Sequence, residues 1–305
     1  MRVLLGVDGS PGSLAAVQFV GRLLAPAKDQ IIFYYSPPPV WVRAVADASG
    51  TAGALQSYLA TAVFDKARQH LPGPLQERVQ TIAGTREVRE GLLIAAEDRR
   101  VDLIVIGARG AGPLNQLSVG SIARHIVHHA TIPVLVVRGA VVPATEPIRV
   151  LLASDGSEVS QHASEVLQRF SWPSGTIGQT ITVLESSAQS QIPEWLAEQL
   201  DDQQLAALGM ARFARNKEEE ARVQQEAARW YGTLPAIFKG HEPLVAAGHA
   251  GEQILRAIDA NRIGLVIVGA RRQGAVRRLL LGSTSEHVLA HAPCSVLVVR
   301  GHEQP

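Results

Sequence analysis

Short, wholly apolar runs alternate along this chain with longer stretches that have the hydrophobic spacing of a helix. Runs such as Leu103-Ile-Val-Ile106 and Val134-Leu-Val-Val137 contain no polar residue. This pattern is typical of strands covered on both faces, as in a parallel sheet between two layers of helices. The strands predicted in the first half are Val3–Val7, Gln30–Tyr35, Val79–Ala83, Leu103–Ile106 and Val134–Arg138.

Helical patterns separate these strands, at Ser13–Leu24, Ala52–Gln69, Glu87–Arg99 and Ile122–His129. The order βαβαβαβαβ predicts a doubly wound parallel sheet. The second half repeats the pattern, with strands predicted near Val150–Ala153, Thr180–Leu184, Ala236–Lys239, Leu265–Val268 and Val296–Arg300.

The two halves also repeat each other in sequence. Gly120–Gly139 aligns with Gly282–Gly301 without a gap, and 11 of these 20 positions are identical. The start of the first half, Val3-Leu-Leu-Gly-Val-Asp8-Gly-Ser10, recurs as Val150-Leu-Leu-Ala-Ser-Asp155-Gly-Ser157. The 305 residues therefore predict two α/β domains of the usual size, at 1–140 and 148–305, joined by a linker from Gly139 to Pro147.

The second half is longer. Asp8 and Gly107 are 99 positions apart (107 − 8), whereas Asp155 and Gly269 are 114 apart (269 − 155). The additional residues lie in 191–231, whose Ala, Glu, Gln and Arg content favours helix. A longer helix covering the sheet is favoured over the alternative, a helix that binds a partner protein.

Two loops follow strands at the edge where doubly wound sheets bind ligands. One is Val7-Asp8-Gly9-Ser10, and the other runs from Gly107 to Ser121. In the second loop, glycines allow the backbone to approach a phosphate closely. Ser121 is expected to cap a helix whose first N–H groups face the anion. Arg109 adds a positively charged guanidinium, which can pair with phosphate oxygens through two donors. The alternative is a glycine-rich turn and a capped helix without a ligand. Neither a P-loop nor a dinucleotide fingerprint after the first strand is present.

The spacing Gly107-x2-Gly110-x9-Gly120-Ser121 resembles the ATP-binding signature of the universal stress proteins. Val7-Asp8-Gly9-Ser10 and the ending His129-Ala130-Thr-Ile-Pro133-Val-Leu-Val-Val137 are also similar to that family. The resemblance covers both halves and implies two tandem Rossmann-like domains of the adenine nucleotide alpha hydrolase-like type.

The resemblance further implies that ATP, with or without Mg²⁺, is bound mainly by the first half. Asp8 and Val7 are expected beside the adenosine, and the backbone near Tyr35 beside adenine. Gly107, Arg109 and Gly110 are expected to line the ribose and phosphates. Gly120, Ser121, Ile122 and Ala123 are expected to hold the β- and γ-phosphates. The sequence does not separate ATP from AMP or a cyclic nucleotide.

The second half departs from the family pattern because Arg272 stands where the middle glycine is expected, between Gly269 and Gly282. An arginine there costs free energy if the position needs a positive φ, and it fills space that a phosphate would use. A vestigial site with solvated arginines is favoured over a contact from Arg272 to the phosphate of another ligand.

Charge, hydropathy and cysteine content argue against several classes of function. A net charge of +1 gives no reason to expect nucleic-acid binding, and neither a signal peptide nor an apolar span is apparent. One cysteine, Cys294, in an apolar run suggests a reducing, cytoplasmic compartment. His125 and His129 share a helix face, but His287 and His291 recur in the second half, so a structural role is favoured over a metal site.

Three functional hypotheses follow. The first is a nucleotide-binding stress-response regulator or sensor that is more a binding protein than an enzyme. The second is a slow ATPase or phosphotransferase on the same site, although the cradle loop offers no evident general base. The third is a nucleotide-independent interaction module. The resemblance also implies a pseudo-dimer of the two domains through their last strands, and a further homodimer of chains that the sequence does not derive. The protein partner is not identified.

Overall fold

The computed structural model describes residues 1–37, 52–109, 119–139, 146–184, 231–270 and 281–301, with a few isolated residues between 199 and 225. The first-half elements are β1 (Arg2–Gly6), α1 (Pro11–Gly21), β2 (Gln30–Tyr35), α3 (Ala52–Arg68), α4 (Gly73–Gln76), β3 (Val79–Ala83), α5 (Val88–Asp98), β4 (Leu103–Gly107), α6 (Ser121–His129) and β5 (Val134–Val137). The second-half elements are β6 (Arg149–Ala153), α7 (Glu158–Gln168), β7 (Ile177–Leu184), η2 (Ala236–Phe238), β8 (Leu244–Ala247), α10 (Ala250–Asn261), β9 (Leu265–Ala270), α11 (Ser283–His291) and β10 (Ser295–Arg300).

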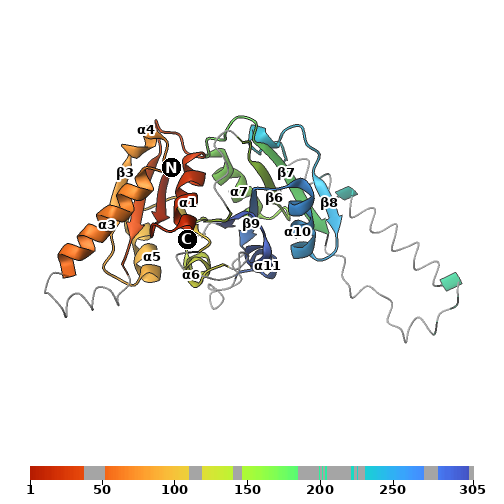
Figure 1. Cartoon of the computed structure of the whole chain (residues 1–305). Coiled ribbons are helices and arrows are strands. Elements are labelled where there is room, and N and C mark those ends of the chain that lie inside the picture. The colour runs from red at the N-terminus through yellow and green to blue at the C-terminus, as the bar shows by residue number, and fades with distance from the viewer. Residues whose placement is uncertain are drawn as a thin grey trace.

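The described strands form one ten-stranded sheet in the order β3-β2-β1-β4-β5-β10-β9-β6-β7-β8. Figure 1 shows this sheet running through both halves, from β3 at one edge to β8 at the other. All pairs within each half are parallel, and each half has the same order about its own first strand. The predicted tandem doubly wound α/β fold is therefore confirmed.

Helices cover both faces of the sheet, so the molecule has three layers. Alternate strand residues such as Val3, Leu5 and Val105 pack with α1, α3, α4 and α7 in one apolar core. Their neighbours, such as Leu4 and Ile104, pack with α5, α6, α10 and α11 in the other. This arrangement is why the central strands are apolar at every position.

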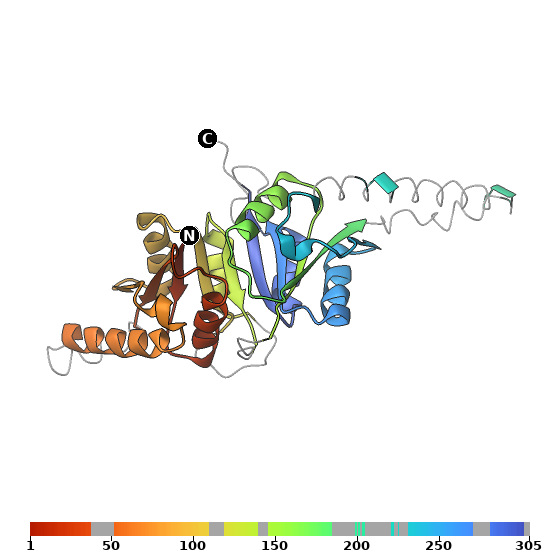
Figure 2. The ribbon, with the colours of Figure 1, turned by 90° about the horizontal axis from the view of Figure 1, so that it is seen from above.

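The two halves meet at their last strands, as predicted. β5 and β10 pair antiparallel, with Val136 opposite Val296 and Leu135 opposite Leu297. Seen from above in Figure 2, the sheet continues across this junction with the halves on either side. Each apolar core therefore contains residues of both halves.

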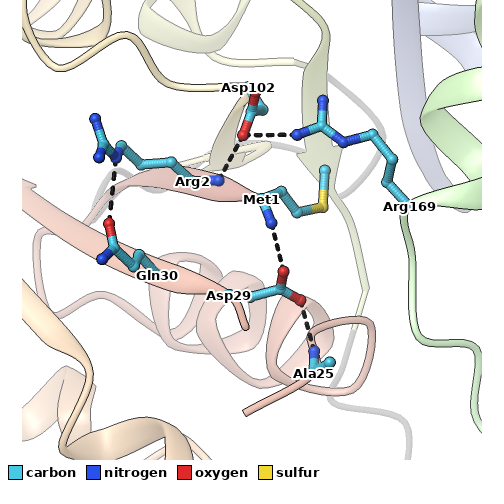
Figure 3. Close-up of polar contacts among 7 residues, drawn as sticks. All are labelled: Met1, Arg2, Ala25, Asp29, Gln30, Asp102 and Arg169. Carbon is cyan, nitrogen blue, oxygen red and sulfur yellow. Dashed lines mark hydrogen bonds and ion pairs between the residues drawn. The ribbon is translucent and has the colours of Figure 1, made fainter. Parts of the chain in front are cut away.

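A second contact joins the halves at the amino-terminal ends of β1 and β4 (Figure 3). The carboxylate of Asp102 accepts a hydrogen bond from the Arg2 backbone N–H at 2.6 Å and pairs with Arg169 of the second half at 2.8 Å. Nearby, the Met1 ammonium pairs with the buried Asp29 carboxylate, which also accepts from the Ala25 N–H at 2.6 Å.

One predicted strand is wrong. Ala236–Lys239 is not a strand but contains the 3₁₀ turn η2, and the edge strand β8 begins later, at Leu244. Pro235 opens the turn, and its carbonyl accepts from the Phe238 N–H at 3.0 Å. The Phe238 ring is fully buried and packs on β7 at Gly178. The apolar run is thus explained by a buried turn rather than by pairing in the sheet.

Three sequence features can be placed as follows. Cys294 is buried, and burial raises the pKa of its thiol to about 12, so it is an inert core residue. No helix in the described part of the chain is long and apolar enough to cross a membrane. The extension at 191–231 and the middle of the linker lie largely outside the described residues.

Candidate functional site

The loop between β1 and α1 is a tight turn built around Asp8. Asp8 Oδ1 accepts hydrogen bonds from the Ser10 N–H at 3.0 Å and from the Ser10 hydroxyl. Gly9 has φ +75°, a conformation that a side chain disfavours. Ser10 then caps α1 by accepting from the Ser13 N–H at 3.3 Å. The side chain of Asp8 remains exposed, so this turn presents a carboxylate at the edge of the sheet.

The second half has the same turn around Asp155. Asp155 Oδ1 accepts from the Ser157 N–H at 3.0 Å, and Gly156 also has φ +75°. The shared arrangement shows that the aspartate holds the turn in both halves. The turn therefore accounts for the aspartate in both halves without a ligand.

The loop after β4 lies directly against the loop after β1. A Cβ built on Gly107 would be 2.7 Å from the Gly12 carbonyl oxygen, and one built on Gly12 would be 2.5 Å from the Arg109 carbonyl oxygen. Any side chain at either position would collide with backbone. Gly107 and Gly12 thus allow the two loops to meet at the carboxyl ends of β1 and β4, where the strand order reverses.

Helix α6 begins at this same place. Gly120 donates its N–H to the Ala108 carbonyl at 2.8 Å and is the N-cap of the helix. Ser121 is the first helical residue, so the expectation that Ser121 caps the helix is wrong. Ser121 and Ile122 are exposed, and Ala123 is buried. Because the first N–H groups of a helix have no intrahelical acceptor, this end of α6 can receive an anion.

Tyr35 lies at the end of β2, close to the Asp8 turn. The Val7 N–H donates to the Tyr34 carbonyl at 2.9 Å, and the Tyr35 carbonyl accepts from the Gly84 N–H at 2.7 Å. Burial, and after it the negative charge of Asp8, raises the pKa of the Tyr35 phenol. Tyr35 therefore lies close enough to Asp8 for the two side chains to interact electrostatically.

Arg109 supplies positive charge beside the cradle. Burial lowers the pKa of Arg138, and the Arg109 guanidinium lowers it further, so the two arginines lie near each other. Gly110 lies outside the described residues. Eight of the predicted site residues lie together at the carboxyl ends of β1 and β4 and the start of α6. They are Val7, Asp8, Gly107, Arg109, Gly120, Ser121, Ile122 and Ala123.

The second half differs at two described positions beside the equivalent edge. Val159 stands where the first half has Gly12, and its Cγ1 is 2.7 Å from a Cβ built on Gly269. Ser285 stands where the first half has Ala123, and its hydroxyl donates to the Gly269 carbonyl at 2.6 Å. Arg271, Arg272 and Gly274 lie outside the described residues. The first half thus has a backbone-lined edge where the second half has two side chains.

The histidine pairs have matching local contacts in both halves. His129 Nδ1 lies 2.8 Å from the His125 carbonyl, and His291 Nδ1 lies 2.9 Å from the His287 carbonyl. Burial and the neighbouring His129 lower the pKa of His125. Among the residues that the structure describes, no three histidine, cysteine or acidic side chains are grouped to hold a metal ion.

One contact to the site was missed by the sequence reasoning. Lys66, near the end of α3, donates from Nζ to the Gly9 carbonyl at 3.0 Å. Its signal in the sequence is weak, because a lysine near a helix C-terminus is explained equally well by the helix dipole. Gly12 is not among the predicted site residues, although its lack of a side chain is what allows the two loops to meet.

Comparison with known proteins agrees with this architecture. The family model described as "Universal stress protein family" matches residues 1–138 and again 148–300. The chain belongs to the universal stress protein family. A universal stress protein from Mycolicibacterium smegmatis is 27% identical over 312 residues, covering 98% of this chain and 96% of that protein.

Two further comparisons show how the tandem relates to other universal stress proteins. A universal stress protein from Thermus aquaticus is 32% identical over 151 residues, which is 50% of this chain and 97% of that protein. The crystal structure of a universal stress protein from Archaeoglobus fulgidus covers 99% of this chain with a TM-score of 0.60 and 19% identity. That likeness supports the fold.

Proposed function

We propose that this universal stress protein is an adenine-nucleotide-binding regulator and that its first half holds one ATP. The observation that carries the proposal is the meeting of two loops and a helix N-terminus at the carboxyl edge of β1 and β4. Gly12 and Gly107 let the two loops pack backbone to backbone at this edge, and the first N–H groups of α6 have no acceptor within the helix, so they can donate to an anion.

In this proposal each part of the site has a separate task. The N–H groups of Ser121, Ile122 and Ala123 receive the outer phosphates, and the positive end of the α6 dipole favours their charge. Arg109 pairs with phosphate oxygens through its fork of donors. The exposed Asp8 carboxylate accepts from hydroxyls of the ribose, while its Oδ1 keeps the turn in place. Tyr35, with Gly110 and the rest of the loop, borders the nucleotide.

ATP fits this site better than a bare nucleoside because the donors are concentrated at its phosphate end. A divalent ion such as Mg²⁺ would accompany the phosphates and reduce their charge. The regulatory part of the proposal is that bound nucleotide changes the surface offered to a partner protein. We also propose that the protein works in the cytoplasm and that its chains form a further dimer.

Isothermal titration with ATP tests the proposed site. Gly120→Val places a branched side chain against the Ala108 carbonyl, which lies 3.2 Å from a Cβ built on Gly120. The matched control is Gly282→Val in the second half, where no described atom lies within 4 Å of a built Cβ. We expect Gly120→Val to abolish binding and Gly282→Val to keep it. Equal binding by both variants, or no binding by the unaltered chain, would contradict the proposal.

The same titration can be extended to function. AMP and cyclic AMP as competitors establish which phosphates matter, because the site is built around the outer phosphates. Incubation with excess ATP then measures turnover. Binding without multiple turnover is expected of a regulator. Hydrolysis that Asp8→Ala abolishes would instead support the ATPase hypothesis.

A further inference from the structure

The last strand of each half ends in an arginine that reaches a helix of the other half. Arg300, at the end of β10, donates from Nη2 to the Val127 carbonyl and to the His128 carbonyl at 3.0 Å in α6. Arg138, just after β5, donates to the Leu289 carbonyl in α11 and to the Ala292 carbonyl beyond it. Val127 and Leu289 are equivalent in the internal repeat, so the two contacts are related by the pseudo-two-fold symmetry.

Arg300 therefore acts on the helix that begins at the proposed phosphate site. Arg300 is only 3% exposed, and its guanidinium donates to carbonyls of the last turn of α6, which have no partner within the helix. Its positive charge also lies at the negative end of the α6 dipole. A phosphate at the N-terminus and an arginine at the C-terminus stabilise the same nine-residue helix from its two ends.

The second half holds this end of α6 by another element as well. Glu286 of α11 lies 3.0 Å from the His128 ring Nε2 and 3.8 Å from the Arg124 guanidinium. Figure 1 shows α6 and α11 next to each other where the halves meet. The position of α6 in the first half is thus fixed partly by β10 and partly by α11 of the second half.

We propose that Arg300 is a positioning residue for the first-half phosphate site, so that this site is complete only when the second half is packed against it. The proposal rests on the proposed function. By linkage, nucleotide bound at the start of α6 also strengthens the Arg300 contact, which gives the second half a means of responding to the ligand. The second half would then serve the first-half site even where it binds no nucleotide itself.

The test compares Arg300→Gln with Arg169→Gln by titration with ATP and, separately, with adenosine. Both variants remove a contact between the halves, but the Arg169–Asp102 pair does not touch α6. We expect Arg300→Gln to weaken ATP binding about fivefold or more while adenosine binding changes little, because adenosine has no phosphate to place at α6. Arg169→Gln should leave both affinities unchanged.

Two further variants separate positioning from loss of folding. Arg300→Lys keeps the charge but places it on a shorter side chain than the one that carries Nη2 to the two carbonyls, so its ATP affinity should lie between those of Arg300→Gln and the unaltered chain. Glu286→Gln changes a half-buried side chain that contacts the same turn, and it should weaken ATP binding in the same direction but less.

Hydrogen exchange of the ligand-free chain distinguishes failure of this inference from failure of the proposed function. Arg300→Gln should increase exchange across 121–129, and Arg169→Gln should not. If Arg300→Gln leaves exchange at α6 unchanged, or weakens ATP and adenosine binding equally, Arg300 has no positioning role. The proposed function would still stand in that case, provided that the unaltered chain binds ATP. If the unaltered chain binds no ATP, the proposed function and the positioning role both fail, and the α6 exchange then reports only a structural contact.

Discussion

Single glycines in this protein are explained by specific atoms that a side chain would strike. Gly12 and Gly107 face backbone, whereas Gly91 and Gly84 face the hydroxyl of the buried Tyr34. Burial raises the pKa of this phenol, so it remains protonated at neutral pH. The sequence marks these glycines only as breaks in a pattern, and the reason for each comes from a residue far along the chain.

Gly91→Ala is predicted to destabilise the protein although it lies inside α5. Helix propensity alone would stabilise the alanine variant by about 1 kcal/mol. A Cβ at Gly91, however, would be 2.0 Å from the Tyr34 hydroxyl, and overpacking of this kind costs about 1–3 kcal/mol. Urea unfolding should therefore show a lower midpoint for Gly91→Ala.

Tyr34→Phe provides the control for this prediction because it removes the hydroxyl that the new methyl group meets. In that background Gly91→Ala should cost about 1 kcal/mol less than in the unaltered chain. An unchanged cost in the double variant would mean that Tyr34 is not the obstacle.

At the scale of elements, the hydrophobic pattern predicted nearly all of the sheet. Gln30–Tyr35 and Val79–Ala83 have the predicted bounds. β2 is buried at every position after Gln30, whereas β3 lies at the edge of the sheet and has three exposed positions. The failure at Ala236–Lys239 has a physical cause. A short apolar run after a proline fits a buried turn as well as a strand, and packing of Phe238 on Gly178 selects the turn.

The caps of the two matched helices differ, which gives a prediction at this scale. Ser10 caps α1 with its side chain, whereas in α7 the Ser157 side chain makes no such bond with the described residues. Ser10→Ala should lower the free energy of unfolding by about 1 kcal/mol, the usual value of a cap. Ser157→Ala should lower it distinctly less. Equal losses in chemical denaturation would show that the side-chain cap contributes nothing to α1.

The whole molecule is one sheet with two apolar cores that both halves share. Leu297 of β10 is fully buried and lies opposite Leu135 of β5, so the junction belongs to the core. The repeat in sequence predicted the contact between the last strands. It did not predict that arginines at the ends of those strands would reach helices of the opposite half.

Calorimetry should show one cooperative unfolding transition for this shared core. Leu297→Ala, at the junction, and Leu75→Ala, in α4 far from it, each delete a fully buried side chain and should cost about 2–5 kcal/mol. Both should lower the temperature of the same transition. Two separate transitions, of which Leu75→Ala moves only the first-half one, would contradict a shared core.

Only those residues of the candidate site that lie directly after a strand or at the start of a helix were predictable from the sequence. Asp8, Gly107, Gly120 and Ser121 each follow or open an element at the same edge, and topology brings them together. Lys66 and Arg300 reach the site or its helix from elsewhere, and only three-dimensional packing places them. The comparison of Val159 with Gly12 likewise needed the structure, because the importance of the position comes from the opposite loop.

The most direct test of the central claim is mass spectrometry of the nucleotide released when freshly purified protein is denatured, with its amount per chain. One ATP per chain, absent from Gly120→Val and retained by Gly282→Val, is the result that this account predicts. Two nucleotides per chain would show that the second half binds as the first does. No nucleotide in the purified protein, together with no binding of added ATP, would contradict the account.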